Sequence, residues 1–237
     1  MRAYYNEIDP YCAQWLRNLI ARGLLPDGDV DERDVRKVQP RELRGYQQVH
    51  LFAGIGGWAL ALRLAGWPPE RRVWTASAPC QPFSSAARGR AAGADDPRDL
   101  WPTTARLYAA AGAPTIFGEQ VASGEGWLTR TGHDLEEMGR DFGAAVLPAC
   151  SVGYDHARPR VYFVGHAYGH SEPRRQVYAE VGRVPGRRGK PRGVVSKDGL
   201  PSRVAVFSAF GNAIVPGVAA AFIACAHQAI CEIETRT

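Results

Sequence analysis

The chain has 237 residues, of which 45% are apolar, 10% aromatic and 22% charged. This composition excludes a mostly disordered chain, and the length favours one domain with a small appendage. We expect no membrane span, because no apolar run approaches about 18 residues, and no secretion signal at the N-terminus. The five cysteines are odd in number and scattered, which predicts a reducing cytosol rather than a disulfide framework or a zinc site.

The net charge of +5 is concentrated in one segment. Residues 170–203 carry nine basic and three acidic side chains, a net charge of +6, so the rest of the chain is close to neutral. A local excess of this kind is typical of a protein that binds a polyanion. A solvated basic loop would give the same pattern.

Strand and helix patterns alternate along the chain. Strands are expected over 2–6, 35–38, 49–52, 73–76, 115–117, 144–147 and 161–164. Helices are expected from Asp9-Pro10 to Gly23, and over 58–64, 100–111 and 135–138. Residues 168–200 lack apolar periodicity and read as a long loop or insert. The alternation predicts an α/β fold with a mainly parallel sheet.

Two motifs follow predicted strands at the edge where open α/β sheets bind ligands. The first, Leu51-Phe52-Ala53-Gly54-Ile55-Gly56-Gly57, is a glycine-rich turn that would bring backbone close to a nucleotide-like ligand. A plain tight turn is the alternative. The second, Pro79-Cys80-Gln81-Pro82-Phe83-Ser84, holds a cysteine between prolines. That thiolate is a candidate nucleophile, against the alternative of a small buried apolar residue.

Three further patterns are weak when each is taken alone. Glu119, in Gly118-Glu119-Gln120-Val121, is a carboxylate at a strand end and a candidate proton donor, or a surface residue. Arg158 and Arg160, two positions apart, are expected to face opposite sides of a strand, one toward a phosphate and the other toward a base. Asn212, in Gly211-Asn212-Ala213-Ile214-Val215-Pro216, would cap a helix or contact a ligand.

The order of these motifs along the chain closely resembles that of the DNA (cytosine-5) methyltransferase family. The resemblance implies a Rossmann-like S-adenosylmethionine-dependent methyltransferase fold. It places the catalytic domain at 1–165 and 201–237, with a very small target-recognition insert at 166–200. The implied activity is methyl transfer from S-adenosylmethionine to C5 of a cytosine flipped out of duplex DNA.

One block of the family is displaced in this chain. The family usually has an acidic stretch and a Gly-Asp-Ile-like stretch between the glycine-rich motif and the cysteine motif, but Gly57 and Pro79 are only 22 positions apart here. Tyr5-Asn6-Glu7-Ile8-Asp9 resembles the acidic stretch, and Gly28-Asp29-Val30 or Asp34-Val35-Arg36 resembles the other. We therefore infer a circular permutation that pairs the N-terminal strand with the strand over 49–52.

The resemblance assigns roles residue by residue. Cys80 matches the nucleophile that adds to cytosine C6, Glu119 the acid at N3, Arg160 the group at O2, and Arg158 its neighbour. Glu7 matches the carboxylate on the cofactor ribose, Ile8 would pack on the adenine, and Asp29 or Asp34 would meet its amino group. The remaining implied cofactor contacts are Phe52, Ala53, Gly54, Ile55, Gly56, Gly57, Pro79, Leu100, Asn212 and Ala213. The implied DNA contacts are Gln81, Ser84, Arg187, Arg188, Lys190 and Arg192.

Two positions depart from the family pattern. Gln120 stands where the family has an asparagine that braces the cysteine loop, and His156 stands where it has a glutamine. The insert is shorter than usual, and a short Gly/Arg-rich loop supplies mainly phosphate contacts. We therefore expect a short target site, or help from a second subunit, with any endonuclease on a separate chain. No metal is expected, and the DNA would be that of a bacterial or phage-infected cytosol.

Three other functions remain open from the sequence, one of which is a C5 transferase that uses a modified methyl donor. A tRNA cytosine-5 methyltransferase would carry the same motifs, and the basic insert does not distinguish the two polymers. A non-catalytic nucleic-acid-binding homologue would have a decayed site, against which the intact Cys80, Glu119, Arg158 and Arg160 argue.

Overall fold

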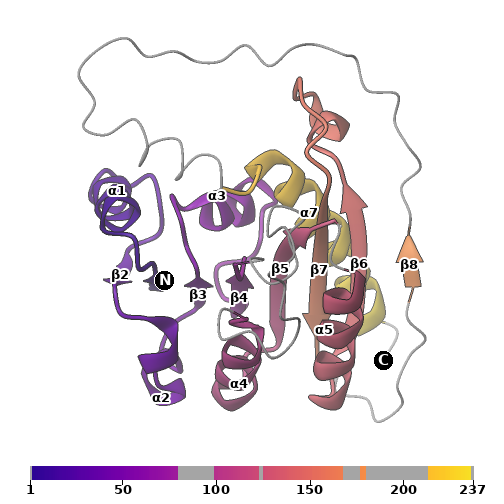
Figure 1. Cartoon of the computed structure of the whole chain (residues 1–237), viewed down its shortest axis with the longest axis horizontal. Helices are drawn as coiled ribbons and strands as arrows, with labels where there is room; N and C mark the ends of the chain where they lie inside the picture. Colours follow the sequence, from indigo (N-terminus) through magenta and orange to yellow (C-terminus); the bar gives the residue numbers. More distant parts are fainter. Residues whose placement is uncertain (1, 80–98, 123–124, 168–176, 180–212, 236–237) are drawn as a thin grey trace, which may run out of the picture.

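One mainly parallel sheet organises the computed structural model, which describes residues 2–79, 99–122, 125–167, 177–179 and 213–235 (Figure 1). In this part of the chain eight strands lie in the order β2-β1-β3-β4-β5-β7-β6-β8. The strands are β1 (Ala3–Asn6), β2 (Gly28–Asp31), β3 (Gln48–Leu51), β4 (Val73–Ala76), β5 (Thr115–Val121), β6 (Asp141–Leu147), β7 (Arg160–His166) and β8 (Val177–Ala179). Strand β7 runs antiparallel to both of its neighbours, β5 and β6.

Helices cover both faces of the sheet (Figure 1). The α-helices are α1 (Pro10–Ala21), α2 (Pro40–Leu43), α3 (Gly57–Leu64), α4 (Trp101–Ala111), α5 (Glu125–Glu137) and α7 (Pro216–Glu234). Two short 3-10 helices are η1 (Val35–Lys37) and η4 (Ala149–Val152). Helix α1 begins as its sequence predicts, since the Asp9 side chain accepts hydrogen bonds from the backbone N–H groups of Tyr11 and Cys12.

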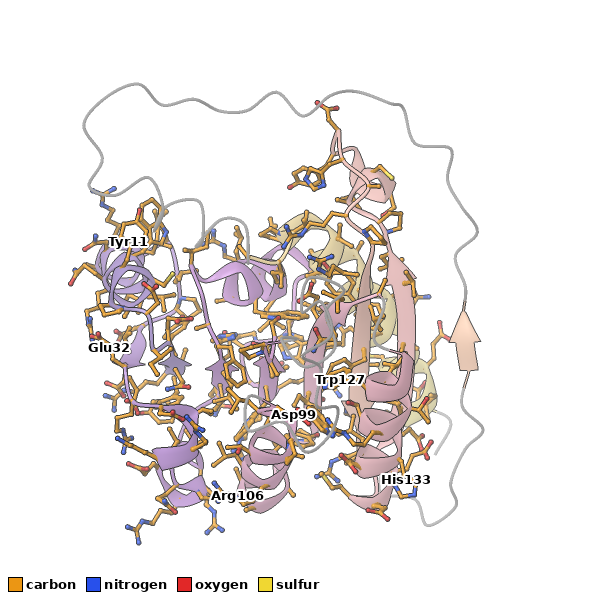
Figure 2. All side chains as sticks on the ribbon, in the orientation of Figure 1. Tyr11, Glu32, Asp99, Arg106, Trp127 and His133 are labelled. Carbon is orange, nitrogen blue, oxygen red and sulfur yellow. The ribbon has the colours of Figure 1, made fainter. Side chains whose placement is uncertain are left out.

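Strand alternation divides the core into two layers. Tyr4, Val49, Trp74 and Ile116 lie in register on one face, where α2, α4 and α5 pack. Figure 2 labels Trp127 of α5 on this side, where its ring lies 5.5 Å from that of Trp101 and 5.7 Å from that of Phe163.

The opposite face carries α1, α3 and α7. Tyr5 packs there with Leu16 of α1 and Ala59 of α3, and Phe117 packs with the α3–α7 pair. Buried His50 on this face lies 2.8 Å from the Thr75 hydroxyl, and burial lowers its pKa to about 3, so the imidazole is neutral. Two apolar layers on a single sheet account for the stability of an α/β domain.

The N-terminal strand lies where the permutation predicts. Strand β1 pairs in parallel with β3, with Asn6 opposite Leu51, and β2 lies outside β1. The prediction that residues 2–6 pair with the strand over 49–52 is therefore confirmed. The permutation is local, because it moves two strands in front of β3 while the spatial order keeps β3 between β1 and β4.

This rearrangement leaves one crossover with an unusual hand. The steps β1–α1–β2 and β3–α3–β4 run in opposite directions along the sheet, yet both helices cover the same face. The steps through α2 and α4 run in the direction of the α3 step but cover the other face. The α3 crossover therefore has the hand opposite to the other three, although about 98% of parallel crossovers share one hand.

Several sequence predictions differ from the structure. Residues 35–37 form η1 rather than a strand, because the Asp34 side chain caps the turn by accepting from Arg36 N; the strand is β2, at 28–31. A three-residue strand, β8, falls inside the predicted loop at 168–200. Helix α7 extends to Glu234, and by length and composition alone it could cross a membrane, although its inner face packs in the core through Val218, Ala219 and Ile223.

Candidate active site

A cavity of about 480 Å³ lies at the carboxyl ends of β1, β3, β4 and β5. The start of β7 and the residues Ala213 and Ile214, just before α7, complete its wall. The end of a parallel sheet is where open α/β folds bind ligands. Most of the described site candidates line this one cavity.

The glycine-rich turn forms one wall of the cavity. Phe52, Gly54 and Gly56 all have positive φ, and Gly56 caps α3 in the left-handed conformation. A Cβ on Gly56 would lie 2.5 Å from a Leu25 methyl group, and a Cβ on Gly57 would lie 2.8 Å from Ile214 Cγ1. Glycine is therefore favoured at position 56 by its positive φ and at position 57 by the close approach of Ile214, just before α7. Gly56 supports the turn without lining the cavity, whereas Phe52, Ala53, Gly54, Ile55 and Gly57 line it.

Glu7 is held against this turn from the end of β1. Its Oε2 accepts a 2.7 Å hydrogen bond from Gly54 N, and its Oε1 accepts a 2.9 Å bond from Asp9 N. Burial raises the pKa of the carboxyl above its ordinary value, and the two N–H donors oppose that shift. A carboxylate 47 positions away in sequence is thus fixed beside the glycine-rich turn.

The two aspartate candidates occupy different places. Asp34 lines the cavity, and hydrogen bonds from Arg36 hold the pKa of its carboxyl at about 2. Asp29 does not line the cavity, and its carboxylate instead pairs with Arg2 and accepts from the Tyr46 hydroxyl. Only Asp34 is therefore positioned to meet a ligand in the cavity.

Apolar candidates complete this half of the cavity. Ile8 is 63% exposed at the rim, which is unusual for an isoleucine. Pro79, Leu100 and Ala213 also line the cavity. The remaining candidates Cys80, Gln81, Ser84, Asn212, Arg187, Arg188, Lys190 and Arg192 lie outside the described residues.

Glu119 and two arginines form the polar centre of the other half. Glu119 is 8% exposed, and its Oε1 lies 2.8 Å from Arg160 Nε. Burial raises the pKa of the Glu119 carboxyl, while Arg160, Arg158 and a hydrogen bond with Ser77 oppose the shift. The carboxyl is therefore easier to protonate than an exposed glutamate and remains next to a fixed cation.

Arg158 and Arg160 line the same cavity, contrary to the expectation that they face opposite sides. The expectation was wrong because residues two positions apart on a strand share a face. In addition, strand β7 begins only at Arg160, and Arg158 precedes it with φ +32°. Arg158 Nη2 donates a 3.0 Å hydrogen bond to Ala213 O. Among the described residues, the two non-glycine residues with positive φ are Phe52 and Arg158, and both line the cavity. Strained backbone of this kind clusters at functional sites.

Gln120 makes a contact that the sequence left in doubt. Its buried Nε2 donates a 3.3 Å hydrogen bond to Ala78 O, and its Oε1 accepts from Val121 N. The glutamine therefore ties β5 to the backbone two residues before Cys80. His156, the other departure, is exposed, with its ring 5.9 Å from that of Tyr154.

Several residues that line the cavity were missed from the sequence, among them Ser77 and Cys12. Ser77 lines the cavity, accepts a hydrogen bond from Trp58 Nε1 and bonds with Glu119. Cys12 also lines the cavity, and burial raises the pKa of its thiol to about 12. The position of Ser77, directly after the strand over 73–76, was the available signal. Cys12 had only its place in the acidic stretch.

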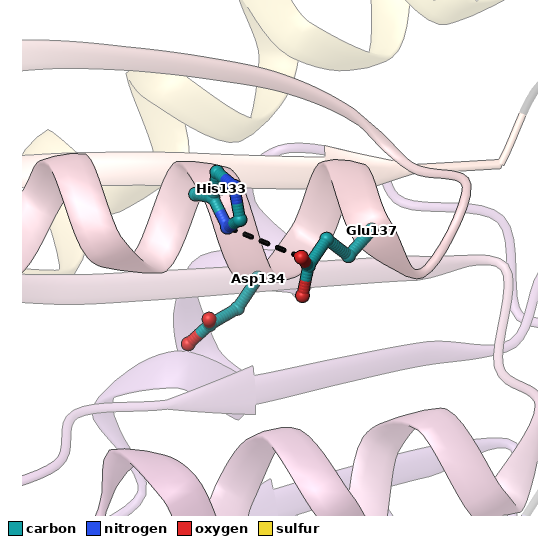
Figure 3. Close-up of side chains that lie close together, drawn as sticks. All are labelled: His133, Asp134 and Glu137. Atoms are coloured by element: carbon teal, nitrogen blue, oxygen red, sulfur yellow. Dashed lines mark ion pairs between the residues drawn. The ribbon is translucent and has the colours of Figure 1, made fainter.

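One group of potential metal ligands occurs among the described residues, on α5. His133, Asp134 and Glu137 lie close together there (Figure 3). His133 Nδ1 and Glu137 Oε1 are 3.6 Å apart, and Asp134 already accepts a hydrogen bond from Trp101 Nε1. The group is an i,i+4 pair on a helix surface beside a structural aspartate, and it lies on a different element from the cavity.

Comparisons with known proteins identify the chain. The sequence model of the C-5 cytosine-specific DNA methylase family matches residues 68–181. The Type II methyltransferase M.NgoMIV of Neisseria gonorrhoeae is 31% identical over 163 residues. The chain belongs to the DNA cytosine-5 methyltransferase family.

The chain spans less than two thirds of the length of the relatives that it matches. The match to M.NgoMIV covers 67% of the chain but 42% of the relative. Among solved structures, a DNMT2 mutant of Spodoptera frugiperda has a TM-score of 0.46 at 15% identity, over 84% of this chain and 60% of that one. A putative DNA modification methyltransferase of an Escherichia coli prophage has a TM-score of 0.44 at 15% identity, over 70% and 40%.

Only part of the candidate site lies within the residues that the family model matches. The matched region contains Pro79, Glu119, Arg158 and Arg160, whereas Glu7, Asp34 and the glycine-rich turn precede it. The unmatched residues include the N-terminal strands that are displaced in this chain. The methyltransferase fold of the sheet nonetheless brings both groups to one cavity.

Proposed function

We propose that the protein transfers a methyl group from S-adenosylmethionine to C5 of a cytosine flipped out of duplex DNA. The observation that carries the proposal is a buried Glu119–Arg160 pair sharing one cavity with the glycine-rich turn and Glu7. Family membership supports cytosine C5 as the methylated atom. Duplex DNA, the flipped base and the residue roles below are our proposal.

The cofactor half of the cavity suits an adenosyl group. Glu7 has carboxylate oxygens next to the turn for ribose hydroxyls, and Asp34 remains ionised as an acceptor for an amino group. A Cβ on Gly54 would meet nothing within 4 Å, so there is room over the turn for a ligand. When bound, S-adenosylmethionine supplies an electrophilic methyl group. Ile8, Phe52 and Leu100 supply apolar surface around it.

The catalytic residues overcome the poor nucleophilicity of cytosine C5. The Cys80 thiolate forms a bond to C6 while Glu119 donates a proton to N3, so that the ring becomes electron-rich at C5 without accumulating charge. C5 then takes the methyl group as the bond from the methyl carbon to the cofactor sulfur breaks. Return of the N3 proton to Glu119, loss of the C5 proton to a base and breakage of the S–C6 bond, which releases the Cys80 thiolate, restore the aromatic ring. Arg160 holds the cytosine O2 and orients Glu119.

Catalysis and target recognition are carried by different parts of the chain. We propose residues 1–165 and 201–237 as the catalytic domain and 166–200 as a short target-recognition insert that contacts phosphates. Because M.NgoMIV is a Type II methyltransferase, a restriction endonuclease on a separate chain is a candidate partner, with cytosolic DNA as substrate. The short insert also favours a second subunit that completes recognition.

A transfer assay tests the proposal. Protein is incubated with S-adenosylmethionine labelled in the methyl group and either duplex DNA or tRNA, and the labelled base is identified by mass spectrometry. We expect 5-methylcytosine in DNA, its loss in Cys80→Ser, and its retention in the control Cys225→Ser, an exposed cysteine on α7. Label in tRNA alone would overturn the substrate. Cofactor binding without transfer to either polymer would indicate a non-catalytic homologue.

A further inference from the structure

The connection between β6 and β7 displays two aromatic rings beyond the end of the sheet. We name residues 148–158 the hairpin tip, which projects past the neighbouring strands next to the start of α7 (Figure 1). Tyr154 is 44% exposed and His156 is exposed, and their ring centroids lie 5.9 Å apart at 36°. Neither residue has a role in the reaction proposed above.

The hairpin tip is held in a fixed shape by its own backbone. Ala149 N donates a 2.6 Å hydrogen bond to Ala157 O across its base, and Ser151 Oγ donates a 2.7 Å bond to Pro148 O. Gly153 ends η4 with φ +90°, a conformation that favours glycine. Two exposed rings on such a closed loop lose less conformational freedom on binding than rings on an open one.

Helix α7 buttresses one side of the tip. A Cβ on Gly217 would lie 3.5 Å from Tyr154 Cε2 and 3.6 Å from Val152 Cγ2, so the tyrosine ring lies against the first turn of α7 at ordinary contact distance. The other end of the tip leads to Arg158, which holds Ala213 O just before the same helix. The tip, the start of α7 and the cavity wall are therefore one connected unit.

The tip also lies at the cavity's end of the sheet. Arg160, the first residue of β7, pairs with Val121, the last residue of β5, and both line the cavity. A polynucleotide that delivers a base to Glu119 and Arg160 must extend past this rim. Aromatic side chains at such places bind unpaired or unstacked bases through their faces.

We propose that Tyr154, extended by His156, stacks against a base that neighbours the flipped cytosine in the DNA. This inference rests on the proposed function, because removal of the cytosine from the duplex leaves its neighbours without a stacking partner. Stacking on an aromatic side chain is tolerant of base identity. The two rings would therefore secure the opened duplex without setting the target sequence.

DNA affinity measured by fluorescence anisotropy tests the inference. Loss of a stacked base changes affinity by about 5- to 150-fold, so Tyr154→Ala should weaken duplex binding within that range. Tyr154→Phe should bind as the wild type, because the ring face is kept. His156→Ala should have a smaller effect, and the control His133→Ala, on the exposed surface of α5, should have none. The salt dependence should not change in Tyr154→Ala, since no charge is removed.

A spectroscopic signal separates stacking from a merely structural role. Once bisulfite sequencing gives the target site, 2-aminopurine is placed at either neighbour of the cytosine, and its fluorescence should be quenched by the wild type and Tyr154→Phe but not by Tyr154→Ala. Wild-type affinity and quenching in a folded Tyr154→Ala would overturn the inference, as would equal losses in the Ala and Phe variants. Methyl transfer by the wild type with neither effect in Tyr154→Ala would overturn this inference alone, whereas absence of methyl transfer by a wild type that binds duplex DNA would overturn the proposed function.

Discussion

Removal of the Gln120 side chain should slow methyl transfer without weakening the binding of S-adenosylmethionine. The Gln120 amide joins β5 to Ala78 O, two residues before the proposed nucleophile, through a buried 3.3 Å hydrogen bond. In Gln120→Ala the Ala78 carbonyl, in a residue only 8% exposed, loses this donor. In Gln120→Asn the side chain is one methylene shorter, and a bond already near the upper limit of length cannot be maintained.

The size of both effects follows from this geometry. A buried polar group left without a partner costs about 1–3 kcal/mol, so the free energy of unfolding should fall by about that amount in Gln120→Ala. Val121 N, which loses its acceptor as well, is partly exposed, and water can replace the bond. A displacement of about 1 Å at a reacting atom can cost up to about 100-fold in rate. We therefore expect kcat to fall roughly 10- to 100-fold.

Three measurements test this prediction: urea unfolding, single-turnover methyl transfer and calorimetric titration with S-adenosylmethionine. The matched control is Gln14→Ala, which removes an exposed amide that bonds only to Asn18 on the same helix. It should change stability by less than about 0.5 kcal/mol and leave kcat unaltered. If Gln120→Ala keeps the wild-type kcat while losing stability, Gln120 is a structural residue and does not position the cysteine loop.

Three further predictions concern the acid, the ribose carboxylate and the basic segment. Glu119→Gln should keep cofactor affinity and lose at least about 100-fold in transfer rate. Because the pKa of the Glu119 carboxyl is raised, the wild-type transfer rate should fall as pH rises through that pKa. The variant should lack this decrease in a pH–rate profile. Glu7→Gln should weaken S-adenosylmethionine binding by about tenfold or more in calorimetry, because one amide oxygen cannot replace a carboxylate that accepts from both Gly54 N and Asp9 N. A variant neutralised at four basic positions should bind all duplexes more weakly, with a salt slope flatter by about 0.9 per lost phosphate contact and an unchanged bisulfite motif; an altered motif with an unchanged slope would contradict it. The four positions are Arg187, Arg188, Lys190 and Arg192.

The sequence predicted the central strands well because their signals are local and strong. Residues 49–52 form an apolar run that ends in glycines, and they became β3 and its turn. Residues 28–31, Gly-Asp-Val-Asp, have low strand propensity, and β2 forms because it pairs with β1 at the sheet edge. Long-range pairing of this kind leaves no periodicity in the sequence, so the strand was placed instead at 35–38.

The site was predictable to the extent that motif residues mark strand ends. Glu7 and the glycine-rich turn could be brought together from the resemblance and the inferred permutation. The choice between Asp29 and Asp34 could not, because it depends on whether a side chain at the edge of the sheet turns toward Arg2 or toward the cavity. The shared cavity of Arg158 and Arg160 was predictable, because residues two positions apart on a strand share a face, whereas the positive φ of Arg158 was not.

The permutation leaves the site intact because the cavity depends on which strand ends are neighbours, not on how they are connected. Asn6 lies opposite Leu51 in the β1–β3 register, and this alone places Glu7 beside Gly54. The permutation changes only the order in which the chain connects the strands. As a result, the β3–α3–β4 crossover has the uncommon hand. That helix is stabilised independently of its connection, since it packs along α7 and buries Trp58, Ala61 and Leu62 against the sheet. Keeping α3 on this face preserves the helix N-terminus at Gly56 next to the cavity, so the unfavourable connection is the one that a cofactor site built on that turn requires.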